Sequence, residues 1–234
     1  MLRGSNFQVI LTAAGFVLEC VRDLCQRMKK FFLLLILIPV FLVSCASARF
    51  ESRFSPVYVT NTSKYAVLPT AAMDGVVDGV ERMTAAFGGQ GQSFDFDVYV
   101  ISDAGQLSMT VFNEFGTTMA SLFYDGTSLD FDSAVFPKSL KAEYIVADFQ
   151  FCLYRADELA AALAKIGVDF EVTRGSGDDG SATETRVLSK KGKIISKITK
   201  ICAPKGEGGV EIPVSVRYEN FLRGYSYTLT GAGE

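Results

Sequence analysis

Residues 94–100 read Phe-Asp-Phe-Asp-Val-Tyr-Val, with an apolar side chain at every second position. Successive residues of a strand point to opposite faces, so this pattern predicts a strand with one buried face. Short turns such as Asp103-Ala104-Gly105 and Asp125-Gly126 separate this run from its neighbours. Strands joined by such short turns pair antiparallel. The runs around residues 94–100 that predict further strands of this kind are 80–87, 107–111, 118–124 and 129–131.

The period then changes from two residues to that of a helix. Ala142, Ile145, Val146 and Phe149 fall at positions i, i+3, i+4 and i+7, the apolar stripe of an amphipathic helix. Residues 157–163 predict a second helix, because acidic residues begin it and a glycine follows its end. Beyond these two helices, strands are predicted again at residues 168–173, 185–189, 194–201, 212–218 and 225–230.

This order of strands, two helices and strands predicts the α+β class with one antiparallel sheet. A sheet of eight or more strands tends to curl. We therefore expect a curled antiparallel sheet with two or three α-helices against its concave face. Two helices are few to fill such a groove, so space for a ligand is expected there.

The N-terminal part carries an export signal. Lys29 and Lys30 precede an apolar run at residues 31–43, and Ser44 stands directly before Cys45. This is the layout of a secretory signal peptide, and the run is short for a membrane span, which needs about 20 residues. Residues 42–45, Leu-Val-Ser-Cys, resemble the lipobox of bacterial lipoproteins, which implies that Cys45 is acylated. A buried core helix and an uncleaved membrane anchor are the alternatives.

The chain is accordingly expected to have four parts. Residues 1–27 are interpreted as a misplaced start, or else as a genuine amphipathic extension, and residues 28–44 as the signal peptide. Residues 45–77 are expected to be a lipidated tether with little regular structure, with an ordered first strand as the alternative. Residues 78–234 are expected to form the half-barrel domain. Because no Asp follows Cys45, we expect the lipid anchor to hold the protein at the outer membrane, facing the periplasm.

Composition argues against several classes of function. The chain has no histidine, which excludes Ser-His-Asp and Cys-His mechanisms and histidine-based zinc sites. Its net charge is −3, and the one basic cluster, residues 190–193, is interpreted as a charged turn. We therefore expect no nucleic-acid partner, no metal, no cofactor and no enzymatic activity. The carboxylate pairs Asp95 with Asp97 and Asp130 with Asp132 are interpreted as solvated, with acid/base chemistry or Ca²⁺ binding as the alternative.

Two cysteines, Cys152 and Cys202, belong to the expected domain. An oxidising periplasm allows a disulfide between them, and the alternative is two buried thiols.

The apolar stripes supply the candidate binding residues. They are interpreted either as ordinary core or as the lining of a hydrophobic cavity for acyl chains. The candidates are Phe94, Phe96, Val98, Leu107, Met109, Val111, Ile145 and Phe149.

Several local motifs resemble those of one family of uncharacterised bacterial outer-membrane lipoproteins. They are Glu114-Phe115-Gly116-Thr117, residues 122–126 (Leu-Phe-Tyr-Asp-Gly), residues 147–151 (Ala-Asp-Phe-Gln-Phe) and residues 217–221 (Arg-Tyr-Glu-Asn-Phe) with the run after Gly224. Genes of this family often lie in fatty-acid or aryl-polyene synthesis clusters. The family is in turn similar to the lipoprotein carrier LolA and its receptor LolB, and the resemblance covers residues 78–230. This chain departs from it in having no tryptophan, with Cys152-Leu153-Tyr154 where a Trp-Pro step is expected.

The resemblance implies an unclosed antiparallel barrel whose cavity holds acyl chains. We therefore expect an outer-membrane lipoprotein that binds or transfers an acylated or lipidic molecule, in connection with fatty-acid or polyene lipid export. Its partners would be the membrane, the cargo and a periplasmic carrier protein. The alternative is a scaffolding lipoprotein of an envelope assembly that has no ligand cavity.

Overall fold

The computed structural model describes residues 54–87, 93–134, 136, 140–177, 181–202 and 213–231. All of these residues belong to one compact unit, which comprises residues 51–234. The predicted signal peptide, the predicted acylation site Cys45 and the extension predicted at residues 1–27 lie outside the described residues.

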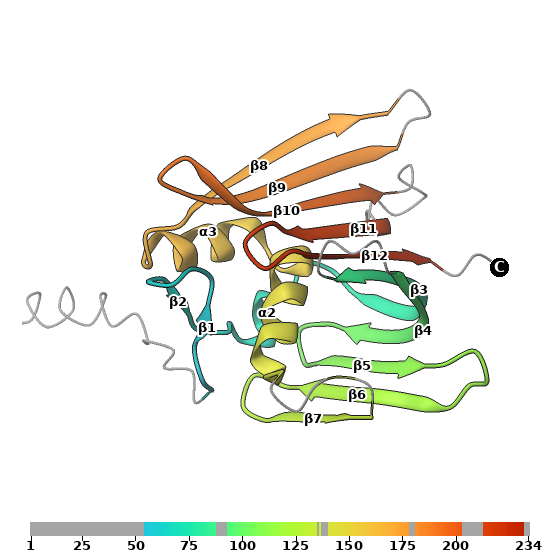
Figure 1. Ribbon diagram of the computed structural model, residues 1–234. Helices are drawn as coiled ribbons and strands as arrows, with labels where there is room; N and C mark the ends of the chain where they lie inside the picture. Colours follow the sequence, from blue (N-terminus) through green and yellow to red (C-terminus); the bar gives the residue numbers. More distant parts are fainter. Residues whose placement is uncertain are drawn as a thin grey trace, which may run out of the picture. The chain divides into compact units, whose positions relative to one another are not determined.

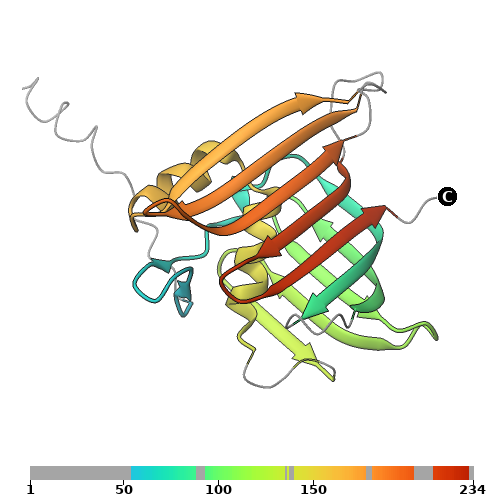
Figure 2. The same ribbon diagram turned by 45° about the horizontal axis from the view of Figure 1, so that its top comes forward.

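The fold is a ten-stranded antiparallel sheet that curls without closing (Figures 1 and 2). Its spatial order is β7-β6-β5-β4-β3-β12-β11-β10-β9-β8, and within the described residues the outermost strands β7 and β8 each pair on one side only. The strands are β3 (Val77–Phe87), β4 (Ser93–Ser102), β5 (Leu107–Phe112), β6 (Thr118–Tyr124), β7 (Leu129–Ser133), β8 (Asp169–Ser176), β9 (Ala182–Lys190), β10 (Lys193–Cys202), β11 (Pro213–Asn220) and β12 (Tyr225–Gly231).

Alternation in the sequence becomes one buried face of the sheet. In β4 and β5, Val98 faces Val111 across the ladder, and both side chains are fully buried. The turn after β6 uses Gly126, whose φ of 90° favours glycine, and the Asp125 carboxylate accepts hydrogen bonds from the amides of Thr127 and Ser128. The predicted strands and their antiparallel pairing are thus confirmed.

Two α-helices follow β7, as predicted. Helix α2 (Ala142–Leu153) lies against the concave face of the sheet, where Phe149 stacks on Tyr227 with ring centroids 6.3 Å apart. Helix α3 (Ala156–Ala164) packs against β8, and its first turn carries Asp157 and Glu158 near the positive end of the helix dipole. The α+β class with helices on an unclosed curled sheet is confirmed.

Residues 54–77 differ from the tether expected for this region. They form the short strands β1 (Val57–Tyr58) and β2 (Lys64–Tyr65) and the 3₁₀ turn η1 (Thr70–Ala72). Tyr65 and Val67 are fully buried in the core. The segment packs because its sparse apolar residues fit against α2, a tertiary contact that strand or helix periodicity does not report. The segment therefore belongs to the folded domain.

Cys152 and Cys202 are separate buried cysteines, and no disulfide joins them. The sequence allowed either a disulfide or two buried thiols, and the structure has the two buried thiols. Burial raises the pKa of the Cys152 thiol to about 12.

None of the helices in the described ranges combines the length and the apolar character that crossing a membrane requires.

Candidate functional site

A cavity of about 900 Å³ lies between α2 and the concave face of β3, β4, β5 and β12. Its size falls within the range of about 300–1,000 Å³ that is typical of small-molecule sites. Most of its lining is apolar or aromatic. The sheet contributes Met83, Ala85, Phe96 and Met109, and the helix contributes Ile145 and Phe149.

Five of the eight predicted binding residues line this cavity, namely Phe94, Phe96, Met109, Ile145 and Phe149. The other three, Val98, Leu107 and Val111, are almost fully buried in the core and do not line it. Alternation identifies which face of a strand is buried, but it does not tell at which point along the strand close packing gives way to open space. The structure therefore separates one predicted stripe into a packed part and a cavity-lining part.

One end of the cavity is polar, and sequence reasoning missed it. The hydroxyl of Tyr225 donates a hydrogen bond of 2.5 Å to Oδ2 of Asp148 on α2. Burial raises the pKa of Asp148 to about 6, although the hydrogen bond from Tyr225 and the charge of Arg223 act to lower it. Asp148 lies directly after Ala147 in the quoted motif, but nothing in the motif indicated that its carboxyl group enters a cavity.

Arg223 completes this polar end from the turn between β11 and β12. Its guanidinium lies 4.1 Å from the ring centroid of Tyr144 and donates a 2.6 Å hydrogen bond to the carbonyl oxygen of Tyr58. Arg223 is exposed and also lines the cavity. It therefore lies where the cavity meets solvent.

Tyr225 and Tyr227 of β12 form one wall of the cavity, and Tyr218 of β11 packs beside them. Tyr218 and Tyr227 are cross-strand neighbours with ring centroids 5.2 Å apart. The Tyr227 hydroxyl lies 3.6 Å from Sγ of Cys152. With a pKa near 12 this thiol is protonated at neutral pH, so it contributes packing and not nucleophilic chemistry.

The opening of the cavity is aromatic. Phe87 and Phe94, at the adjoining ends of β3 and β4, are each 46% exposed, with ring centroids 6.3 Å apart. The Phe87 ring also lies 6.4 Å from that of Tyr225. Exposed apolar side chains that are grouped in this way are typical of ligand-binding grooves and of protein or membrane interaction sites.

Residues 80–231 match the protein family DUF3261, a family of unknown function. The chain belongs to this family. No curated protein matches the chain. The DUF3261 match begins inside β3 and ends with the last residue of β12, so it spans α2, α3 and nearly all of the ten-stranded sheet. All of the side chains lining the cavity come from within it.

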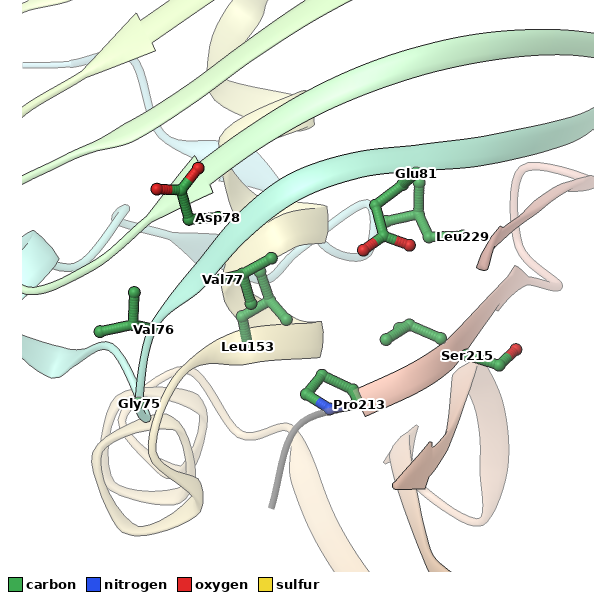
Figure 3. Close-up of a pocket in the computed structure, with 10 residues that line it drawn as sticks. Gly75, Val76, Val77, Asp78, Glu81, Leu153, Pro213, Ser215 and Leu229 are labelled. Atoms are coloured by element: carbon green, nitrogen blue, oxygen red, sulfur yellow. The ribbon is translucent and has the colours of Figure 1, made fainter. Parts of the chain in front are cut away.

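The DUF3261 domain has a second, smaller pocket of about 630 Å³ near the first residues of β3 (Figure 3). Glu81 points into it beside Leu229, and burial raises the pKa of the Glu81 carboxyl group. Asp78 lies at its rim and accepts a 2.7 Å hydrogen bond from the Tyr99 hydroxyl on the outer face. This pocket lacks the aromatic lining of the larger cavity.

A buried ionic cluster holds the C-terminal end of α2 to the sheet. Glu184 Oε1 lies 2.7 Å from Nε of the fully buried Arg186 and 2.6 Å from Nζ of Lys200. Nη1 of Arg186 donates hydrogen bonds to the carbonyl oxygens of Phe151 and Tyr154. Burial acts to raise the pKa of Glu184, but the hydrogen bond from Lys200 and the two positive charges outweigh it and lower that pKa to about 2.

The carboxylate pairs identified in the sequence lie on the face away from the cavity. Asp95 accepts a hydrogen bond from Thr84, Asp97 forms an ion pair with Arg82, and Asp130 and Asp132 are exposed. Among the described residues, no group of three or more His, Cys, Asp or Glu side chains is arranged to hold a metal ion.

Proposed function

We propose that this DUF3261 protein is an outer-membrane lipoprotein, anchored through Cys45 and facing the periplasm, that binds or transfers an acylated or lipidic molecule. The observation that carries the proposal is the apolar cavity of about 900 Å³ between the curled sheet and α2. The cargo would be a lipoprotein acyl chain or a polyene lipid, in connection with fatty-acid or polyene lipid export.

The energetics of such binding need few directed polar contacts. Each methylene group moved from water into the cavity contributes about 0.8 kcal/mol. Association costs about 4–15 kcal/mol in lost freedom. A long acyl chain can offset this cost through the burial of its methylene groups alone. Such binding suits a cavity whose lining is mostly apolar.

The polar end gives the bound molecule a direction. The acyl tail would lie along Met83, Phe96 and Met109, and the head group would remain beside Arg223 and Tyr144 near solvent. Asp148 and its Tyr225 partner would meet the first polar atoms of the head group.

The resemblance to LolA and LolB expected from the sequence motifs would fit a carrier or receptor role. Both the proposed relatives and this chain combine an unclosed antiparallel sheet with helices over an apolar cavity. A periplasmic carrier protein would then deliver or collect the cargo.

A bulky substitution inside the cavity tests the proposal. Ala85 is buried and faces the cavity, so Ala85→Phe fills space that a ligand needs. Val80→Phe adds a larger side chain at a site on the same strand that is 49% exposed and outside the cavity. Overpacking costs about 1–3 kcal/mol, so both variants are first checked for cooperative thermal unfolding.

Fluorescent fatty-acid binding, together with organic extraction and mass spectrometry of the purified protein, gives the readout. We expect wild type and Val80→Phe to bind, and Ala85→Phe to bind at least about tenfold more weakly, since bulk excludes the chain. Ile145→Trp should reproduce the loss from the helix side. A protein that carries no lipid and binds no fatty acid would instead favour the scaffolding role.

A further inference from the structure

Three neighbouring turns form one end of the domain, and we call them the basic edge. It consists of residues 57–65, 190–195 and 220–225, which are the β1–β2, β9–β10 and β11–β12 hairpin connections (left side of Figure 1). Hydrogen bonds join the three. Lys190 Nζ donates to Thr62 Oγ1 at 3.1 Å, the Phe221 amide donates to the Ile195 carbonyl at 2.9 Å, and Arg223 donates to the Tyr58 carbonyl.

The basic edge carries positive charge on a chain that is acidic overall. Its three segments contain five cations, no Asp and no Glu, whereas the whole chain has a net charge of −3. The cations are Lys64, Lys190, Lys191, Lys193 and Arg223. The nearest acids border it: Asp148 accepts a hydrogen bond from Tyr225, Glu219 adjoins Asn220 in sequence, and Asp169 lies opposite Ser189 on β9.

Large apolar side chains protrude between these cations. Ile194 is 51% exposed, Phe221 55% and Leu222 49%. They lie at or beside hairpin turns, where side chains extend from the sheet. Exposed apolar residues that are grouped in this way mark an interaction surface.

We propose that the basic edge docks onto the surface of an anionic phospholipid bilayer. The lysines would approach lipid phosphates, each contributing attraction near the membrane surface, while the apolar side chains insert at the headgroup level. A bilayer explains the composition better than an acidic protein does, because protein interfaces are depleted in lysine, and four of the five cations are lysines.

The basic edge is continuous with the cavity opening. Arg223 belongs to both, and Tyr225 at the end of the edge contacts the exposed ring of Phe87. Docking would therefore place the opening against the lipid headgroups. If the cavity binds acyl chains, as proposed above, a chain could pass between bilayer and cavity with little exposure to water, but the docking itself does not depend on cavity binding.

The test is co-flotation of the full chain with vesicles of phosphatidylcholine alone or of equal parts phosphatidylcholine and phosphatidylglycerol. The edge variant is Lys191→Glu with Lys193→Glu, both at exposed turn positions. The matched control is Lys197→Glu with Arg217→Glu, which changes the net charge equally on the outer face of the sheet. All variants keep residues 31–43, so membrane affinity of that segment is common to them.

We expect wild type and control to bind the anionic vesicles at least about tenfold more tightly than the edge variant, with the difference shrinking in high salt. Replacing Ile194 and Phe221 by Ser should weaken binding further, whereas replacing the exposed Val80 and Ile201 by Ser should not. The cavity variant Ala85→Phe should bind vesicles like wild type, which separates this test from that of the cavity. Equal binding by edge variant and control would overturn the proposal. The proposal would also be overturned if the protein bound a poly-glutamate peptide through the basic edge but did not bind vesicles. The partner of the basic edge would then be an acidic protein.

Discussion

The hydroxyl of Tyr225 on β12 donates a hydrogen bond to the carboxyl group of Asp148 on α2, over 2.5 Å and inside the cavity. This bond joins the last strand of the sheet to the helix that covers it. It also places a titratable group in surroundings where its ionised form is poorly solvated, so the stability of the fold should depend on pH near neutrality.

The first prediction concerns Asp148→Asn. The folded-state pKa of about 6 lies above the ordinary 3.8, so the folded protein binds the proton more tightly than the unfolded chain does. The resulting stabilisation is complete below pH 3.8 and is lost as the pH rises through 6, a change on the order of 3 kcal/mol. Urea unfolding at pH 4 and pH 8 should show the variant gaining stability relative to wild type at the higher pH. An equal difference at both values would contradict the prediction.

The second prediction concerns the buried ionic cluster. Arg186→Met removes one cationic partner of Glu184, which keeps Lys200, and it removes the donor to two carbonyl oxygens at the end of α2. We expect a loss of about 2–5 kcal/mol in the free energy of unfolding, since two buried carbonyl oxygens lose their donor and Glu184 loses one of its hydrogen-bonded cations. The control Arg217→Met, at an exposed arginine on β11, should change it by no more than about 0.5 kcal/mol. Chemical denaturation measures both, and similar losses would argue against a special role for the cluster.

A third prediction addresses the segment before β3. Gln150 on α2 accepts hydrogen bonds from the Tyr65 hydroxyl at 2.8 Å and the Leu68 amide at 2.9 Å, and it donates to the Leu68 carbonyl at 2.7 Å. Gln150→Leu should cost about 2–5 kcal/mol because these buried groups lose their partner. Gln106→Leu, outside this network, is the control.

Hydrogen exchange should localise that effect. Amides of residues 57–68 should exchange faster in Gln150→Leu, while those of β4 and β5 change only with global stability. Unchanged exchange at residues 57–68 would mean that the segment is held by its apolar contacts alone.

The fourth prediction is that Cys152 is chemically silent in the folded protein. Its thiol is buried with a pKa near 12, so almost no thiolate is present at pH 8. In thiol titration with a disulfide reagent, wild type and Cys152→Ala should release equal amounts in native buffer. When both proteins are first reduced and then unfolded in guanidinium chloride, wild type should show one more reactive thiol than Cys152→Ala. A difference already present in native buffer would show that the thiol is accessible.

Much of the fold could be predicted from the sequence because local periodicity carries it. The alternation at residues 94–100 and the stripe from Ala142 to Phe149 correspond to β4 and α2 within one or two residues at most ends. Periodicity carries no information about which strands pair when they are far apart in the sequence. Nothing local indicates that β12 inserts beside β3, with Tyr227 opposite Ala85.

The candidate site was predicted only in part for a similar reason. Phe96 and Val98 are equivalent in an alternating pattern, yet one lines the cavity and the other is fully buried. Their difference depends on how far α2 extends over the sheet. Arg223 and Asp148 escaped notice because they are distant in sequence and become neighbours of the same cavity only through the β11–β12 turn.

The pairing of β3 with β12 has a consequence for synthesis. Strands β3 to β7 are made early and can form hairpins with one another, but the second edge of β3 has no partner until the last strand of the domain has been made. Until then a bare strand edge and half of an apolar pocket are open to association with other chains. A product truncated before Tyr225 would keep that edge permanently, so we expect such fragments to be captured by chaperones or degraded. The cavity is thus completed only when β12, a strand of seven residues, has been made and has paired with β3.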